Sequence, residues 1–333
     1  MDLLTHGLVG AALAHSAAAP REARLAACVG FTSGLLADAD ALVDSASDPL
    51  LVLEYHRHFT HALLFVPVGA LVAAAILWPL LRKRMAFGRV YLYAFCGYAL
   101  AGLLDACTSY GTHLLWPFTE ARTAWSIISV IDPIFTLLMA VTLAIAIVKR
   151  RASVARVGLA LAAGYLAIGL LQHERAEAAA RSLAQERSHQ PERLLVKPAF
   201  GNIVLWRSLY VVEGRAHADA VRVGPRGGVI IYAGDSIALL EPARDLRDAP
   251  PGSRARTGAE RFAALADGYA ALHPRRPNLV GDARYAMLPN GIEPLWGVTY
   301  DPERPDSGVR FVTDRSLTPE TRRRFIDMLL GRS

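Results

Sequence analysis

Nine histidine and aspartate side chains lie beside or within apolar segments between residues 6 and 132. They are His6, Asp38, Asp40, His56, His58, His61, Asp105, His113 and Asp132. A charged side chain in hydrocarbon costs about 2.5–3.5 kcal/mol on insertion scales, so such residues persist where a partner, a cavity or an ion compensates them. Imidazole nitrogens and carboxylate oxygens are ligands of divalent transition metals. The sequence therefore predicts a metal site.

Nine candidates exceed the four positions of a closed tetrahedral zinc site. Some of them would not bind the ion directly but would hydrogen-bond to the ligands and orient them, or up to three ions would share the pocket. His and Asp ligands without cysteine favour zinc, with manganese and iron(II) as alternatives. Water activated by such an ion makes hydrolysis the expected chemistry. Asp40 or Asp105 could then act as the base, and Arg57 or Arg122 could hold an anionic group such as phosphate.

Local alternatives remain at several of these positions. His58 and His61 are three residues apart and would share one face of a helix, although such a cluster could also contact only lipid headgroups. Gly111 would let the chain turn and bring His113 back toward Asp105. Asp132 precedes a proline, so it could be only a helix cap.

The elements that must position these residues are apolar runs. The chain of 333 residues is 53% hydrophobic, and its long apolar runs end near residue 172. A helix needs roughly 20 apolar residues to cross a bilayer. The predicted spans are Leu3–Ala19, Leu25–Val43, Phe59–Leu81, Val90–Tyr110, Ile127–Val148 and Val154–Gln172. The expected fold is a membrane all-α domain of about six transmembrane helices over residues 1–172, a helical stalk over 173–190 and a small soluble α+β domain over 191–333.

Basic residues set the expected orientation. They gather in every second loop, at Arg21–Arg24, Arg82–Arg89 and Lys149–Arg156, and the positive-inside rule makes these loops cytoplasmic. The nine candidate ligands and the soluble domain then share the opposite side, which is periplasmic in a bacterial inner membrane. Topology also explains the net charge of +6 without a nucleic-acid partner. A cleaved signal peptide would remove His6, but the first segment has no Lys or Arg before its apolar stretch.

The soluble domain carries no convincing catalytic set. Short strands are expected over residues 203–213, 216–223 and 229–233, and helices are expected to start at Thr257 and Thr318. We expect this domain to cover the membrane site or to recognise its substrate.

Four separated motifs resemble the YdjM-like family, which is described as inner-membrane-associated, metal-dependent hydrolases. They are Thr5-His6-Gly7, Leu36-Ala37-Asp38-Ala39-Asp40, His56-Arg57-His58-Phe59-Thr60-His61 and Asp105-Ala106-Cys107-Thr108. The resemblance implies metal ligation by His6, Asp38, His56, His61 and Asp105, with Asp40 and Asp132 in support, and chemistry like that of zinc-dependent phospholipases C. His58 stands where the family pattern often has glycine, and Ala62 where it often has serine.

The sequence thus favours a metal-dependent hydrolase at the outer leaflet, acting on a phospholipid or another amphipathic phosphoester. The alternative is a metal-binding membrane protein without enzymatic activity, either an ion transporter or a scaffold for the outer domain. A transporter should show ionisable residues on both sides of the membrane and an inverted repeat, and the sequence has neither.

Overall fold

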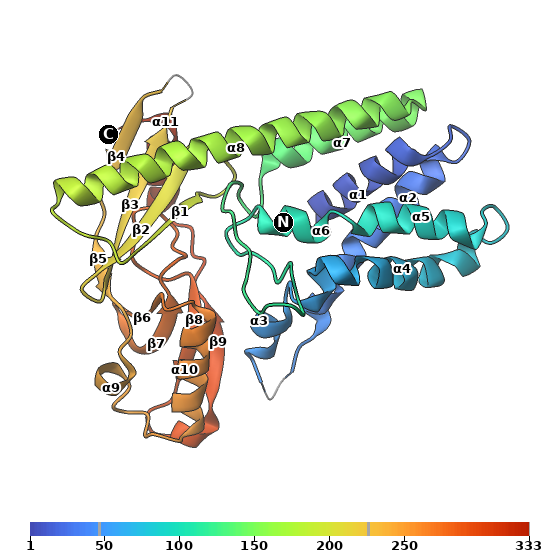
Figure 1. Cartoon of the computed structure of the whole chain (residues 1–333). Coiled ribbons are helices and arrows are strands. Elements are labelled where there is room, and N and C mark those ends of the chain that lie inside the picture. Colours follow the sequence, from blue (N-terminus) through green and yellow to red (C-terminus); the bar gives the residue numbers. More distant parts are fainter. Residues whose placement is uncertain (46–47, 225–226, 333) are drawn as a thin grey trace. The chain divides into compact units, whose positions relative to one another are not determined.

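The structure is a computed structural model, and it describes residues 1–45, 48–224 and 227–332. The chain divides into two compact units (Figure 1). The membrane unit comprises Met1–Val43, Tyr55–Leu171 and Phe200–Ile203. The β-rich unit comprises Asp44–Glu54, Gln172–Ala199 and Val204–Ser333.

The membrane unit is built from helices and short 3-10 turns. In chain order they are α1 (Leu3–Ala17), α2 (Ala23–Leu36), η1 (Ala37–Leu42), η2 (Phe59–His61), η3 (Leu63–Phe65), α4 (Val66–Leu81), α5 (Phe87–Tyr98), α6 (Ala101–Ala106), α7 (Pro133–Lys149) and α8 (Ala152–Glu186). The last helix, α8, continues past Leu171 into the β-rich unit, and a short helix, α3 (Leu51–Tyr55), includes the change of unit after Glu54.

Four helical segments in the described residues are long and apolar enough to cross a membrane. They are Ala23–Leu42, Leu63–Leu81, Phe87–Ala106 and Ala152–Glu186. The first and fifth predicted spans form α1 and α7, of 15 and 17 residues. At a rise of about 1.5 Å per residue these helices measure about 22 and 26 Å, short of the roughly 30 Å hydrocarbon core. Membrane helices are confirmed, and six crossings remain a prediction.

The helices of the membrane unit pack through glycines. A Cβ on Gly30 of α2 would lie 2.5 Å from the carbonyl oxygen of Gly10 in α1, and one on Gly97 of α5 would lie 2.4 Å from the carbonyl oxygen of Gly30. Backbones that approach this closely gain van der Waals contact where the hydrophobic effect offers little. Large apolar side chains point outward instead, among them Ile76 and Leu137, which are 58% and 64% exposed.

Two predicted spans are interrupted near the candidate ligands. The segment predicted as one helix over Phe59–Leu81 breaks at Ala62, whose backbone is extended at φ −68° and ψ 142°. The break is stabilised by the N–H of Leu63, which donates to the carbonyl of Leu114 in another loop at 3.0 Å. His58 lies before η2 with a non-helical backbone at φ −91° and ψ −123°, so the prediction that His58 and His61 share one helical face is wrong. The span predicted over Val90–Tyr110 likewise forms two helices, α5 and α6.

The β-rich unit contains two antiparallel sheets. One is ordered β1 (Arg193–Pro198), β2 (Leu205–Val212), β3 (Arg215–Val223) and β4 (Val229–Tyr232), with β5 (Ser236–Ala238) also paired to β3. The other is ordered β6 (Ala270–His273), β7 (Arg276–Asp282), β8 (Trp296–Tyr300) and β9 (Val309–Thr313). The remaining short elements are α9 (Pro242–Asp245) and η4 (Pro305–Ser307).

Two helices cover these sheets and complete an α+β domain. In α10 (Arg254–Leu265), Phe262 is buried with Val280 and Val298 of the second sheet. In α11 (Pro319–Leu330), Met328 packs with residues of the first sheet. The first of these helices starts three residues before the predicted Thr257, because the Ser253 side chain accepts from the N–H of Arg256 and so caps it.

Candidate metal centre

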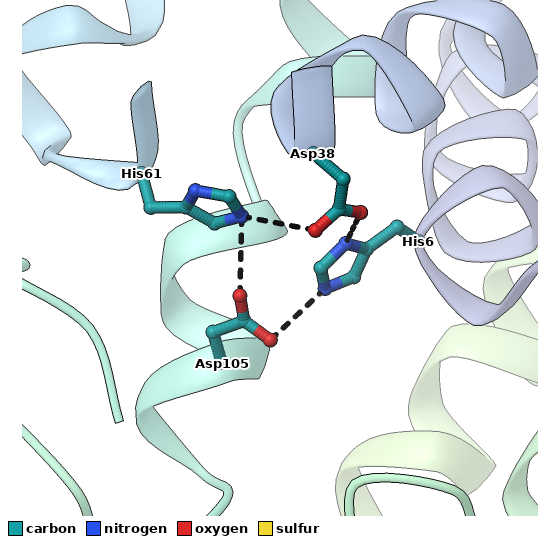
Figure 2. Close-up of side chains that lie close together, drawn as sticks. All are labelled: His6, Asp38, His61 and Asp105. Carbon is teal, nitrogen blue, oxygen red and sulfur yellow. Dashed lines mark hydrogen bonds and ion pairs between the residues drawn. The ribbon is translucent and has the colours of Figure 1, made fainter. Parts of the chain in front are cut away.

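Four of the predicted ligands, each from a different helical element, meet inside the membrane unit. His6 lies in α1, Asp38 in η1, His61 in η2 and Asp105 in α6. Each offers one nitrogen or oxygen atom within 4.8 Å of the others. Figure 2 shows that histidine and aspartate alternate around the group. We call this set of four residues the buried cluster.

The distances in the buried cluster match those of ligands around one ion. The exception is the 2.7 Å hydrogen bond between His6 Nδ1 and Asp38 Oδ2, which leaves His6 Nε2, 3.3 Å from Asp105 Oδ1, as the nitrogen available to an ion. His61 Nε2 lies 3.5 Å from Asp38 Oδ1 and 3.1 Å from Asp105 Oδ2 (Figure 2). Ligand atoms at about 2.0–2.1 Å from a tetrahedral zinc ion are about 3.3–3.4 Å apart. The side chains would need only small shifts to bind an ion.

Several polar atoms of the buried cluster lack hydrogen bonds. Among the described residues, Nε2 of His6 and Nε2 of His61 are buried and make none, and the carboxylate of Asp105 makes ion-pair contacts with the Met1 amino group and Arg57 but no hydrogen bond. A buried polar atom left in this state costs about 1–3 kcal/mol. A cation between the imidazoles and the carboxylates would satisfy all of them, so these residues fit a metal ion.

The charge around the cluster also favours a cation. Asp38, Asp40 and Asp105 bring three carboxylates, whereas the Arg57 guanidinium and the Met1 amino group are the positive groups in contact with Asp105. With both imidazoles neutral, the group carries a net negative charge in a site where water is largely excluded. Buried charge of one sign is stabilised by a counter-ion.

Asp40 lies behind His61 rather than within the cluster. Its Oδ2 atom is 3.2 Å from His61 Nδ1, and it also accepts hydrogen bonds from the backbone N–H of Arg57 at 2.8 Å and the hydroxyl of Thr60 at 2.5 Å. Its other oxygen is 3.2 Å from Nδ1 of His56. A carboxylate in this place fixes the tautomer of a ligating histidine and leaves Nε2 free for the ion. The geometry makes Asp40 a positioning residue.

We expect Asp40→Asn to weaken metal binding by about 10–100-fold without abolishing it, because the four atoms of the buried cluster remain while His61 loses its orienting carboxylate. Competition with a chelator of known affinity measures the change. Asp44→Asn is the matched control, since Asp44 is an exposed carboxylate four residues further along. Equal affinities of Asp40→Asn and the control would contradict this role.

Arg57 is turned inward. The residue is 3% exposed, its Nε lies 3.0 Å from Asp105 Oδ2, and its terminal nitrogens donate to the Thr108 hydroxyl and the Met1 carbonyl at 3.2 and 2.9 Å. The guanidinium therefore neutralises Asp105 and holds it in place. The predicted contact between Arg57 and an anionic substrate does not fit this arrangement.

The prediction that all nine candidates converge on one pocket is wrong. His58 and His113 form a separate group with Glu120. Gly111 does turn the chain, at φ +71°, but the backbone N–H of His113 then donates to the carbonyl of Arg57, and its ring lies beside that of His58. Burial, with Arg122 and His58 nearby, lowers the pKa of His113 to about 4.

Two further candidates also lie outside the buried cluster. Asp132 caps α7: its Oδ1 accepts from the N–H groups of Ile134 and Phe135, both at 3.1 Å, and its Oδ2 accepts from the Tyr165 hydroxyl at 2.9 Å. The capping alternative thus describes Asp132 and the ligand role does not. His56 contacts Asp40 and has a side chain that is 28% exposed.

Sequence reasoning missed Glu120 and Thr60. Glu120 lies in an irregular loop, where no helical or strand periodicity relates it to His58. Thr60 was visible only as a neighbour of His61, yet its hydroxyl bonds Asp40 and lies 3.0 Å from His61 Nδ1. A search for hydroxyl side chains next to candidate histidines would have found Thr60.

The fold and the site define a class: a helical membrane protein with a buried histidine–aspartate cluster suited to a metal ion. The family model named YdjM inner membrane protein matches residues 1–176. The chain belongs to this family. The match covers all four residues of the buried cluster and ends before the sheets of the β-rich unit. No curated protein and no solved structure matches the chain.

Proposed function

We propose that this chain is a metal-dependent membrane hydrolase that acts on a phospholipid or another amphipathic phosphoester. The observation that carries the proposal is the alternating ring of His6, Asp38, His61 and Asp105, in which Nε2 of both histidines is buried and makes no hydrogen bond in the described residues. Zinc is the metal that we favour, because two imidazoles and two carboxylates without thiolate suit it, with manganese and iron(II) as alternatives.

The side chains around the ring have distinct tasks in this proposal. A divalent ion held there supplies Lewis acidity and activates water near neutral pH. Asp40 keeps the proton of His61 on Nδ1 and leaves Nε2 as the ligand atom. Arg57 balances the charge of Asp105. Side-chain exposures of 0% for His6, His61 and Asp105 and 11% for Asp38 exclude bulk water, and Asp38 is the edge from which a substrate would approach.

The apolar surroundings support an amphipathic substrate. Leu63 and Leu64, two and three residues after His61, are 42% and 57% exposed, and Phe118 in the loop over 111–126 is 82% exposed. Exposed apolar groups beside a polar site are typical of surfaces that bind lipid or other apolar partners. A lipid phosphoester has an apolar tail for the exposed apolar side chains and a polar phosphate for the buried cluster.

The proposed orientation places the cluster at the periplasmic side of a bacterial inner membrane, together with the β-rich unit. The loops that join α1 to α2, α4 to α5 and α7 to α8 carry the basic residues and lie at one end of the membrane unit (Figure 1). Asp38 follows the far end of α2, and Asp105 lies near the end of α6, which continues from α5. The positive-inside rule would put the basic loops in the cytoplasm. Six crossings, with α1 and α7 as short spans, complete this topology.

The experiment is turnover of a phospholipid panel by the purified full-length protein in lipid nanodiscs, with products identified by mass spectrometry. We expect the wild type to release a phosphorylated headgroup or a phosphate, chelation to stop the reaction, and Asp38→Asn to reduce turnover at least about 100-fold while Asp44→Asn retains it. Turnover by Asp38→Asn equal to that of the control would overturn the assignment of this site.

A second candidate function is a metal-stabilised scaffold without catalysis. The complete burial of His6, His61 and Asp105 favours it, because four protein ligands in a dry site are typical of structural zinc. The scaffold predicts that Asp38→Asn lowers the thermal unfolding temperature and that the wild type turns over no lipid. The hydrolase predicts lipid turnover by the wild type.

A further inference from the structure

A second group of metal-ligating side chains lies in the loops of the membrane unit. His58 follows α3, and His113 and Glu120 belong to the loop between α6 and α7. One ligand atom from each lies within 4.8 Å of the others. The His58 Nε2 atom is 3.5 Å from Glu120 Oε2, and the two imidazole centroids are 4.4 Å apart at an interplanar angle of 45°. None of these residues belongs to the buried cluster.

The two imidazoles are held in place and keep ring nitrogens without partners. His113 is 9% exposed, and the His58 side chain is 18% exposed. The Nδ1 atoms of both residues are buried and make no hydrogen bond in the part of the chain that the structure describes. A buried imidazole nitrogen without a hydrogen bond is unfavourable, and binding of a metal ion would satisfy it.

Backbone bonds and aromatic rings fix the positions of these histidines. The N–H of His58 donates to the carbonyl of Tyr55 at 3.2 Å, and the carbonyl of His113 accepts from the N–H of Trp116 at 3.1 Å. The Trp116 ring packs edge-on against His58 at 5.7 Å between centroids. The third group differs, because the Glu120 side chain is 75% exposed. The two histidines are therefore preorganised as ligands, and Glu120 would complete the site from the solvent side.

We propose that His58, His113 and Glu120 form a second divalent transition-metal site, open to solvent and separate from the buried cluster. Two imidazoles and one carboxylate are a donor set for zinc and related ions, and three protein ligands leave at least one coordination position for water or an anionic group. The exposed carboxylate makes this ion more exchangeable than one in the buried cluster. The proposal does not depend on hydrolase activity.

Metal titration of the full-length protein tests this proposal. Metal-free protein in detergent is titrated with Co²⁺, and binding is followed by visible absorption and elemental analysis. We expect two classes of site in the wild type. Glu120→Gln should weaken only the weaker class by about tenfold or more, since one of its three ligands is lost. Asp38→Asn should remove the tighter class and leave the weaker one.

Further variants keep the test interpretable. Glu186→Gln, which removes an exposed carboxylate elsewhere, should leave both classes unchanged. His58→Gly should abolish the weaker class in a protein that still binds one ion tightly. A single class in the wild type, or a second class unchanged in both Glu120→Gln and His58→Gly, would overturn the proposal. If Asp38→Asn kept the tighter class of site, the result would instead count against metal binding by the buried cluster.

Discussion

Asp105→Asn is expected to reduce the metal content of the purified protein to background and to destabilise the membrane unit by about 3–5 kcal/mol. The carboxylate lies 3.3 Å from His6 Nε2 and 3.1 Å from His61 Nε2, so it contacts both imidazoles of the buried cluster. It is also the ionic partner of the buried Arg57 guanidinium. Asparagine removes one ligand and leaves that guanidinium without its carboxylate. Elemental analysis and thermal unfolding in nanodiscs measure the two effects.

Asp132→Asn is the matched control for this prediction. Asp132 is another fully buried aspartate of the membrane unit, but it caps α7 and contacts Tyr165. Because asparagine caps a helix about as well as aspartate, this replacement should change the stability little and leave the metal content unchanged. Equal metal contents in the two variants would contradict the cluster described above.

Gly102→Ala should also remove the metal, although residue 102 offers no ligand atom. Gly102 is three residues before Asp105 in α6, and a Cβ there would lie 2.0 Å from the carbonyl oxygen of His61. Backbone atoms at that distance must move, so either His61 or Asp105 leaves its position. We expect metal content below about one tenth of the wild type and a lower unfolding temperature, although alanine normally favours a helix over glycine by about 1 kcal/mol.

Gly164→Ala provides the comparison within the same unit. Gly164 lies in α8, and nothing stands within 4 Å of a Cβ built on it. The same chemical change should there leave metal binding intact and raise stability slightly, by about 0.5–1 kcal/mol. If Gly102→Ala bound metal as well as Gly164→Ala, the close approach of α6 to His61 would not be needed to form the cluster.

Apolar runs were sufficient to predict where membrane helices lie, and the nine candidates chosen by residue chemistry include all four residues of the buried cluster, His6, Asp38, His61 and Asp105. Each of these residues is ionisable and sits in or beside an apolar run, and desolvation makes such a position costly without compensation. The predicted helix start at Thr318 is also confirmed, because the Thr318 hydroxyl accepts from the N–H of Thr321 and so caps the helix.

The errors arose where distant parts of the chain decide local structure. The extended residue Ala62 ends the 3-10 turn that carries His61, and the hydrogen bond from Leu63 to Leu114 that accompanies it joins residues far apart in sequence. Asp38 and Asp40 are two residues apart, yet the 3-10 turn directs one into the cluster and the other behind His61. Helical periodicity carries no information about either arrangement. The cap and ligand hypotheses for Asp132 were separated by the structure, in which Asp132 accepts from the N–H groups of Ile134 and Phe135 and lies outside the buried cluster.

X-ray absorption at the edge of the metal that copurifies with the protein tests the central claim most directly. With the weaker class of site emptied by mild chelation, the account predicts one ion per chain, bound by two imidazole nitrogens and carboxylate oxygens at about 2.0–2.1 Å, with no sulfur ligand. The same spectrum from Asp132→Asn should be unchanged. A sulfur ligand, a single imidazole, or a metal content no higher than that of Asp105→Asn would contradict the account.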